Sequence, residues 1–258
     1  MKAKKSYGQH FLTSEKIAEK IADAIQLSTE WKYLLEVGPG KGMLTKYLMQ
    51  KPYPLTAVEA DADMVAYLKI HYPSLNVIFN DFLKLDFSSV FGTEPFGLIG
   101  NFPYNISSQI VFMMIDHKNQ IPEMVGMFQK EVAERIVATP NGKDYGILSI
   151  LTQAWFDATY LFGVDKANFN PPPKVQSAVV RLVRKSNMEL GCDEKLFKNI
   201  VKQTFNQRRK MLRNTLKQFV NEDKFLENPL YTKRPENFSV QDFINLTNDV
   251  EAWIKNNS

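Results

Sequence analysis

Asparagine, proline and tyrosine stand close together at Asn101, Pro103 and Tyr104, directly after an apolar run at 96–99. Pro103 fixes its own φ and disfavours a helical conformation for Phe102. We therefore expect the Asn101 side chain and the Phe102 carbonyl to be held in a fixed geometry beside the flat Tyr104 ring. Two oxygen acceptors next to an aromatic face suit a planar group that carries an exocyclic amine. The alternative is a plain turn in which Asn101 caps the next helix.

A glycine-rich turn follows another apolar run, at 33–37, and has the sequence Gly38-Pro39-Gly40-Lys41-Gly42. Glycines let the backbone approach a ligand closely, and the N-terminus of the helical pattern that follows favours negative charge. The spacing is G-x-G-x-G and not the G-x-G-x-x-G of dinucleotide-binding proteins. By itself the turn therefore indicates only that a ligand has room to approach.

Two acidic residues follow the next apolar runs. Glu59 lies 21 residues after Gly38 (59 − 38 = 21), near the offset of about 20 at which an acid binds ribose hydroxyls. Asp81 is placed to accept a hydrogen bond from an adenine amine, and Phe82 to pack on a purine. The alternatives are solvated or turn acids and a core phenylalanine. Together with the Asn101 segment, these residues indicate a site for an adenosine-containing cofactor.

The elements that must position these residues alternate between strands and helices. Strands are expected at 33–37, 55–59, 77–79, 96–99, 124–128, 159–164 and 175–183. Helical patterns lie between most of them, at 17–25, 43–49, 62–70, 109–115, 130–137 and 145–156. This order predicts an α/β fold, with a mostly parallel seven-stranded sheet and helices on both faces. No helix separates the last two strands, which can therefore pair antiparallel.

The loop between the last two strands, at 168–174, contains three consecutive prolines. Because prolines stiffen the chain, Phe169 should be held in one place at the rim of the loop. A stiff aromatic residue can serve as a stacking platform for an unpaired base. It can equally fill a gap in the core, and the sequence leaves both possibilities open.

The composition excludes several classes of protein. Hydrophobic residues make up 44% and charged residues 23% of the 258 residues, as in ordinary globular proteins. The single cysteine, Cys192, excludes an internal disulfide and a cysteine-rich zinc site, and three scattered histidines argue against a histidine metal site. The basic N-terminus has no apolar segment behind it and no uncharged run is long enough to cross a bilayer, which predicts a cytoplasmic protein without membrane contact.

The composition changes after Lys185, which predicts a first domain at 1–185 and a helical domain at 186–258. Between Lys195 and Lys217 there are eight basic and no acidic residues, so the rest of the chain carries 4 − 8 = −4 of the net charge of +4. Apolar residues from Phe197 to Leu216 share one helical stripe, and the run can break near Asn206. A solvated charged face is the alternative, but an acid-free run of this length favours contacts with the phosphates of a polyanion.

Nearly the whole chain resembles the ribosomal RNA adenine dimethyltransferases that modify the small subunit, the kasugamycin-resistance family. The motifs that carry the resemblance are YGQHFL at 7–12, EVGPG at 36–40, GNFPYNIS at 100–107, QKEVA at 129–133, YGILS at 145–149, PPKVQSAVV at 172–180 and FNQRRK at 205–210. Two residues depart from the family pattern: His10 stands where asparagine is usual, and Phe102 where leucine is usual.

The resemblance implies a Rossmann-like methyltransferase sheet with a small all-helical C-terminal domain, and S-adenosyl-L-methionine as the cofactor. The implied cofactor-binding residues are His10, Leu12, Gly38, Gly40, Glu59, Asp81, Phe82 and Asn101. The implied catalytic residues, which would orient and stack an extruded adenine, are Asn101, Phe102, Pro103, Tyr104 and Phe169.

The implied reaction is dimethylation of N6 of two adjacent adenosines in the 3′-terminal hairpin of 16S rRNA during ribosome biogenesis. The implied partner is the immature 30S particle, which a monomer of this chain would bind. The residues expected to hold rRNA phosphates are Lys198, Lys202, Arg208, Arg209, Lys210, Arg213 and Lys217.

Three other functions are compatible with parts of the sequence. A large-subunit rRNA adenine methyltransferase that confers macrolide resistance shares the same core, but the segments at 169–175 and 207–210 favour the small-subunit family. A ribosome-assembly factor with a vestigial site is a second alternative, against which the intact Asn101, Pro103 and Tyr104 argue. A nicotinamide dehydrogenase is a third, and the glycine spacing counts against it.

Overall fold

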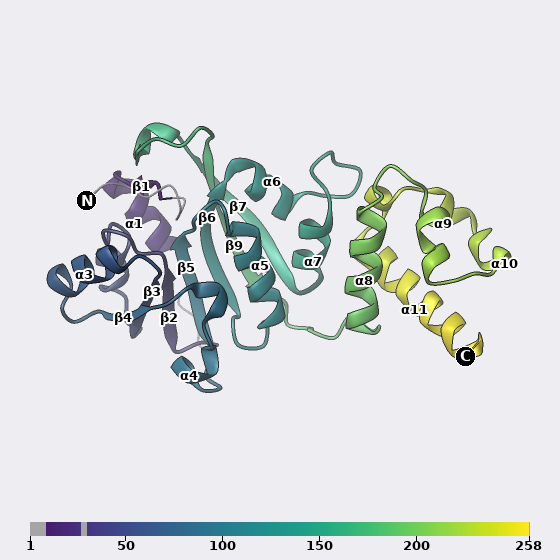
Figure 1. Cartoon of the computed structure of the whole chain (residues 1–258), viewed down its shortest axis with the longest axis horizontal. Coiled ribbons are helices and arrows are strands. Elements are labelled where there is room, and N and C mark those ends of the chain that lie inside the picture. The colour runs from purple at the N-terminus through teal and green to yellow at the C-terminus, as the bar shows by residue number, and fades with distance from the viewer. Residues whose placement is uncertain (1–8, 27–29, 258) are drawn as a thin grey trace. The chain divides into compact units, whose positions relative to one another are not determined.

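The computed structural model describes residues 9–26 and 30–257, so the first part of the predicted N-terminal arm, including Tyr7 and Gly8 of the YGQHFL motif, lies outside the described residues. The chain forms two compact units (Figure 1). The first unit comprises the described residues up to Ala133 together with Asp157–Arg184, and the second comprises Glu134–Phe156 and the described residues from Lys185 onward.

The first unit is built on the predicted seven-stranded sheet, in the order β4-β3-β2-β5-β6-β9-β7. Its strands are β2 (Tyr33–Val37), β3 (Leu55–Glu59), β4 (Asn76–Phe79), β5 (Phe96–Asn101), β6 (Glu123–Gln129), β7 (Phe156–Val164) and β9 (Ser177–Arg184). The five strands from β4 to β6 are parallel, and β9 pairs antiparallel with β6. The carboxyl ends of β2, β3, β4 and β5 therefore meet at one edge of the sheet.

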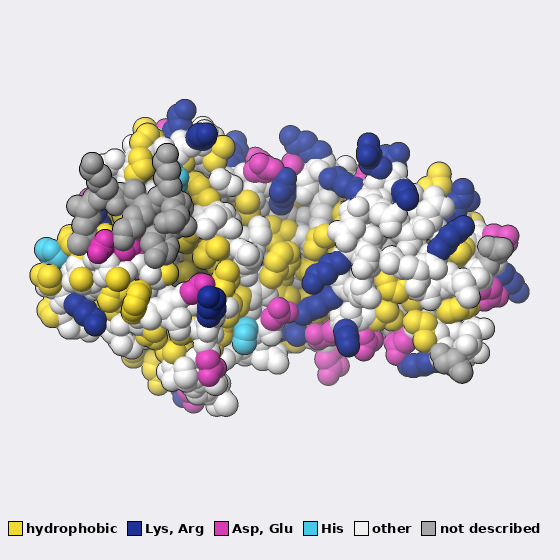
Figure 2. Space-filling view, viewed as in Figure 1, with side chains coloured by type: hydrophobic (Ala, Val, Ile, Leu, Met, Phe, Trp, Pro, Cys, Tyr) yellow, Lys and Arg dark blue, Asp and Glu magenta, His cyan; other side chains and the backbone are white. Residues whose placement is uncertain are grey.

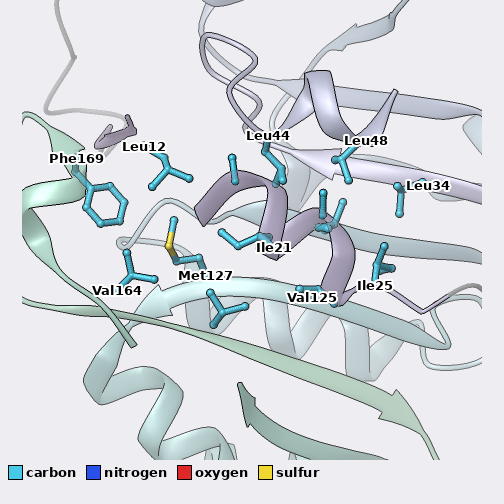
Figure 3. Close-up of a cluster of buried hydrophobic side chains, with 14 of the residues drawn as sticks. Leu12, Ile21, Ile25, Leu34, Leu44, Leu48, Val125, Met127, Val164 and Phe169 are labelled. Carbon is cyan, nitrogen blue, oxygen red and sulfur yellow. The ribbon is translucent and has the colours of Figure 1, made fainter. Parts of the chain in front are cut away.

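Helices pack on both faces of this sheet. Those of the first unit are α1 (Glu15–Ala24), α2 (Thr45–Leu48), α3 (Ala62–His71), α4 (Phe87–Phe91), α5 (Ser107–Asp116) and the first part of α6 (Lys130–Val137), with short 3₁₀ turns at Phe82–Lys84 and Lys166–Asn168. Ile21 of α1 belongs to one apolar cluster with Ile99 of β5 and Val125 of β6 (Figure 3). Phe96 of β5, an odd number of residues from Ile99, points to the other face and stacks on Phe91 of α4.

A second, two-stranded sheet pairs β1 (Phe11–Leu12) antiparallel with β8 (Phe169–Asn170). Local periodicity does not predict these strands, because each is two residues long. The pairing joins the N-terminal segment to the proline-rich loop, and Thr13 extends it by donating a backbone hydrogen bond to the Asn168 carbonyl.

The second unit is helical. Its elements are the second part of α6, α7 (Ile147–Trp155), α8 (Glu194–Phe205), α9 (Leu212–Thr215), α10 (Asp223–Leu226) and α11 (Val240–Asn257), with 3₁₀ turns at Leu216–Gln218, Pro229–Thr232 and Pro235–Asn237. The buried stripe of α8 ends at Phe205, so the expected break near Asn206 is present.

The boundary between the two units differs from the predicted division at residue 185. Residues 134–156 lie within the predicted first domain but pack with the C-terminal helices, because α7 contacts α8 and α11. Trp155 of α7 makes an edge-to-face contact with Phe197 of α8, and Tyr145 makes one with Phe205. Across the described residues, no helix is long and apolar enough to cross a membrane.

Candidate active site

A cavity of about 850 Å³ opens at the carboxyl ends of β2, β3, β4 and β5. Its lining includes all the predicted cofactor residues and four of the five predicted catalytic ones. Those lining residues are His10, Leu12, Gly38, Gly40, Glu59, Asp81, Phe82, Asn101, Phe102, Pro103 and Tyr104. The volume lies within the range of about 300–1,000 Å³ that is usual for small-molecule sites.

The glycine turn forms one wall of the cavity. Gly38 and Gly40 have φ values of +66° and +55°, a region that side chains disfavour. A Cβ at Gly40 would lie 3.0 Å from Cε1 of Phe11, so the turn also allows the N-terminal segment to close over it. The Lys41 ammonium lies 5.3 Å from the centroid of the same Phe11 ring.

Glu59 is 6% exposed at the end of β3. Its two carboxylate oxygens accept backbone N–H groups, one from Gly40 at 3.1 Å and one from Asp61 at 3.0 Å. Burial raises the pKa of Glu59, and these hydrogen bonds counteract part of the rise. Because each carboxylate oxygen has two lone pairs, the residue retains the capacity to accept hydrogen bonds from a sugar diol.

Glu36 is a lining residue that the sequence analysis missed. It is 2% exposed, stands two residues before Gly38, and accepts a hydrogen bond of 2.7 Å from the Thr45 hydroxyl. Burial raises the pKa of Glu36 to about 8. An acid within an otherwise apolar strand, directly before the glycine turn, was the signal that could have identified it.

Replacing Glu36 by glutamine should flatten the pH dependence of stability. In the native chain Glu36 holds its proton up to about pH 8, against an ordinary value of 4.5. The folded state therefore binds more protons between these values, and its stability falls as the pH rises through that window, by up to about 1.4 kcal/mol per pH unit. Urea unfolding at pH 5, 7 and 8.5 measures this slope, and glutamine at the exposed Glu227 is the control. Equal slopes in the native chain and Glu36→Gln would contradict the assignment.

Asp81 and Phe82 follow the end of β4 and line the cavity. Oδ1 of Asp81 accepts the Leu83 N–H at 3.0 Å and so begins the short 3₁₀ turn. That bond occupies one of the two carboxylate oxygens. Phe82 is 3% exposed and packs against Phe87, which gives the cavity a firm apolar wall at this end.

The Asn101 amide has a defined orientation. Its Nδ2 lies 3.0 Å from the backbone carbonyl of His10. Because a carbonyl only accepts hydrogen bonds, the atom facing His10 is the NH₂ group, and Oδ1 is turned away from that carbonyl as an acceptor. The alternative role of Asn101, as a cap for α5, is not observed: the N-cap residue of α5 is Ile106, without a side-chain cap.

The Phe102 ring fits in its place because glycines on two neighbouring strands leave room for it. Its N–H donates to the Met127 carbonyl at 3.1 Å, and its side chain is 1% exposed. A Cβ on Gly126 would lie 2.8 Å from Cδ2 of Phe102, and one on Gly100 would lie 2.8 Å from Cε1. These two glycines explain how the chain accommodates phenylalanine where the family usually has leucine.

Replacing Gly126 by alanine should destabilise the first unit by about 1–3 kcal/mol, because the new methyl group overpacks the Phe102 ring. Adding Phe102→Leu should recover only part of the loss, since it relieves the contact with the Phe102 ring but leaves the contact of the methyl group with Cε2 of Phe128, at 2.6 Å. Urea unfolding of the single and double variants measures the coupling. Gly163→Ala is the matched control, because its Cβ would meet nothing closer than 3.5 Å. Additive losses in the double variant would refute the packing argument.

The N-terminal segment closes one side of the cavity. Gln9 donates to Oδ2 of Asp61 at 3.0 Å, and the His10 ring stacks on Tyr104. Leu12 lines the cavity and also packs in the apolar cluster beneath it. The departure at His10 therefore leaves the segment in place.

Phe169 does not line the cavity, where a residue that stacks on the substrate base is expected. It is 4% exposed and packs in the apolar cluster with Leu12 and Val164 (Figure 3). The physical reason is the pairing of β8 with β1, which turns alternate side chains to opposite sides, so Asn170 lines the cavity instead. The core-filling role is the one that this structure supports.

The family model of ribosomal RNA adenine dimethylase matches residues 1–248. The chain belongs to this family. A ribosomal RNA small subunit methyltransferase A from Phocaeicola vulgatus is 55% identical over 259 residues, covering 99% of this chain and 92% of that protein. The protein of the same name from Flavobacterium johnsoniae is 51% identical, covering 98% and 97%.

Solved structures resemble this chain over nearly its full length. A dimethyladenosine transferase from Plasmodium falciparum superposes with a TM-score of 0.80 at 27% identity, covering 94% of this chain and 98% of that one. The 23S rRNA methyltransferase ErmE gives a TM-score of 0.67 at 25% identity, covering 92% and 99%. The sequence-predicted methyltransferase fold is thereby confirmed.

In the second unit, the expected phosphate-binding residues fall into two groups. Those that are exposed are Lys202, Arg209, Lys210, Arg213 and Lys217, and dark blue side chains spread over this unit in Figure 2. Lys198 and Arg208 are half-buried, and their charged groups contact other parts of the protein. Lys198 lies over the Trp155 ring, and Arg208 donates to the carbonyls of Gly142 and Lys143 and pairs with Glu236.

Two further exposed cations, Lys233 and Arg234, were missed because they lie outside the acid-free run. The backbone N–H of Leu212 donates to the Lys233 carbonyl at 2.9 Å, which brings this segment beside α9. The cationic surface of the second unit is therefore larger than the one expected from the sequence.

Proposed function

We propose that this chain transfers methyl groups from S-adenosyl-L-methionine to N6 of two adjacent adenosines in the 3′-terminal hairpin of 16S rRNA. The observation that carries the proposal is the orientation of the Asn101 amide, whose Nδ2 donates to the His10 carbonyl and whose oxygen remains as an acceptor in the cavity wall. Membership of the rRNA adenine dimethylase family supports the same reaction.

The cavity fits the cofactor by the chemistry of its lining. Glu59 holds the ribose hydroxyls, Asp81 the adenine amine and Phe82 the purine face, while Gly38 and Gly40 leave room for the methionine part. His10 and Leu12 close the site from the N-terminal side. When bound, S-adenosyl-L-methionine supplies an electrophilic methyl group on its sulfonium.

The residues on the substrate side make N6 of adenine a better nucleophile. Its lone pair is delocalised into the ring, and hydrogen bonds from N6–H to Asn101 Oδ1 and the Phe102 carbonyl localise and aim it. Pro103 fixes the turn that presents these acceptors, and Tyr104 stacks the extruded base. No strong general base is required, because a methylated ammonium loses its proton readily. Most of the rate gain therefore comes from positioning.

The exposed cations of the second unit hold rRNA phosphates. Lys202, Arg209, Lys210, Arg213 and Lys217 carry no compensating acid within their own run, and Lys233 and Arg234 extend the surface. Phosphate contacts position the RNA without reading its sequence. We further propose that the chain acts as a monomer on the immature 30S particle, in the cytoplasm.

The test is transfer of a labelled methyl group to three substrates: under-methylated small subunits, large subunits and naked rRNA. We expect N6-dimethyladenosine on small subunits alone, identified by mass spectrometry of nuclease fragments. Alanine at Arg209 and Arg213 together should raise the KM for small subunits and reduce its salt dependence, whereas alanine at the exposed Lys69 of the first unit should not.

The likeness to a 23S rRNA methyltransferase gives the large subunit as a second candidate substrate. Label on large subunits alone would keep the chemistry and overturn the proposed substrate. No label on any of the three, with small subunits still bound, would overturn the enzyme and leave an assembly factor.

A further inference from the structure

The Tyr104 hydroxyl is hydrogen-bonded to a residue that has been assigned no role in binding the cofactor or the substrate. It lies 2.5 Å from Oγ of Ser177. Ser177 is fully buried as the first residue of β9 and is paired in register with Gln129 of β6. The outer end of the Tyr104 ring is therefore attached to the central sheet as well as to its own turn.

A second contact fixes the face of the same ring. The His10 imidazole stacks on Tyr104 with the ring centroids 5.4 Å apart and the planes inclined by 28°. Nδ1 of His10 lies 2.8 Å from the Pro171 carbonyl. Since that carbonyl can only accept, Nδ1 carries the hydrogen, and the imidazole plane is held from the proline-rich loop.

His10 also orients the second substrate-side group. Its backbone carbonyl accepts Nδ2–H of Asn101 at 3.0 Å. Three segments far apart in the chain, at residue 10, residues 101–104 and residue 177, thus form one connected set of contacts. Both groups that receive the base, the Tyr104 ring and the Asn101 amide, are fixed in the chain without a substrate.

We propose that Ser177 and His10 are positioning residues of the methyl transfer, which hold the Tyr104 ring and the Asn101 amide ready for the extruded adenine. The proposal rests on the proposed function, since it concerns the geometry of the same reaction. Ser177 acts only through Tyr104. His10 acts through its ring on Tyr104 and through its carbonyl on Asn101, and an asparagine, which the family usually has at this position, would lack the ring.

A double-mutant cycle tests the Ser177 contact. Ser177→Ala and Tyr104→Phe each remove the same hydrogen bond, so each should lower kcat about tenfold, in proportion to the net value of one buried hydrogen bond. The double variant should lose about tenfold as well, instead of the hundredfold expected for independent effects. The KM for S-adenosyl-L-methionine should stay within about twofold, which separates loss of positioning from a general loss of structure.

Three further variants complete the experiment. Ser149→Ala removes another fully buried, hydrogen-bonded serine, in the second unit, and should leave kcat unchanged. His10→Asn keeps the backbone carbonyl and loses the ring, and should lower kcat several-fold. Tyr104→Ala removes the stacking ring itself and should lower kcat more than His10→Asn or Ser177→Ala does. If Ser177→Ala lowers the melting temperature, Tyr104→Phe still reports the bond, because it leaves β9 intact.

Full kcat in both Ser177→Ala and Tyr104→Phe, or losses that multiply in the double variant, would overturn the positioning role. A native chain that transfers no methyl group to any RNA would overturn the proposed function instead. The two failures are therefore distinguished by the activity of the unmutated chain.

Discussion

Replacing Asn101 by alanine should lower the kcat of methyl transfer by about 10²–10³-fold, the usual cost of removing one preorganised polar group from a transition state. The side-chain oxygen that accepts N6–H is lost, while the Phe102 carbonyl and the Tyr104 ring remain. The Kd for S-adenosyl-L-methionine should rise much less than kcat falls, because Asn101 is one of several cofactor-binding residues and Glu59 and Asp81 are untouched. Single-turnover transfer to small subunits and calorimetric titration of the cofactor measure the two quantities.

Two variants make this result specific. Asn119→Ala removes an exposed asparagine from the turn before β6 and should leave kcat unchanged. Asn101→Asp keeps oxygen acceptors but loses the NH₂ group that donates to His10, so it should be impaired although its size is the same. Activity of Asn101→Ala within tenfold of the native chain would show that the amide is not the acceptor.

Replacing Glu59 by alanine should raise the Kd for S-adenosyl-L-methionine about 10²-fold. A hydrogen bond to a charged group contributes about 1.5–3 kcal/mol, and the deletion also leaves the N–H groups of Gly40 and Asp61 without their acceptors. The kcat at saturating cofactor should fall much less, because Glu59 does not contact the adenine that is methylated. Titration calorimetry with the cofactor measures the affinity.

The pH dependence of this affinity has a definite sign. Burial raises the pKa of Glu59, and the ribose hydroxyls bind the ionised carboxylate. Cofactor affinity in the native chain should therefore fall as the pH is lowered, beginning at a higher pH than an ordinary carboxyl group would give, whereas Glu59→Gln should bind weakly at every pH with little slope. Glutamine at the salt-bridged surface residue Glu94 is the control. An unchanged slope in Glu59→Gln would assign the pH dependence to another group.

Much of the site could be predicted from the sequence because its residues lie at strand ends. Glu59, Asp81 and Asn101 each follow an apolar run, and the carboxyl ends of parallel strands meet at one edge of a sheet whatever their order. The glycine turn between β2 and α2 is likewise a local feature that the sequence shows directly. Periodicity, turn chemistry and spacing therefore determined the fold class, the cofactor edge and the Asn101 segment.

The tertiary structure decided what depends on long-range partners. The pairing of β8 with β1 buries Phe169, and the Gly142 and Lys143 carbonyls engage Arg208, although both residues read as nucleic-acid contacts in the sequence. Glu36 became a buried acid only through its place within the sheet. Local patterns state which side chains are apolar or charged, but not which distant segment covers them, because burial and hydrogen bonding are set by contacts between residues far apart in the chain.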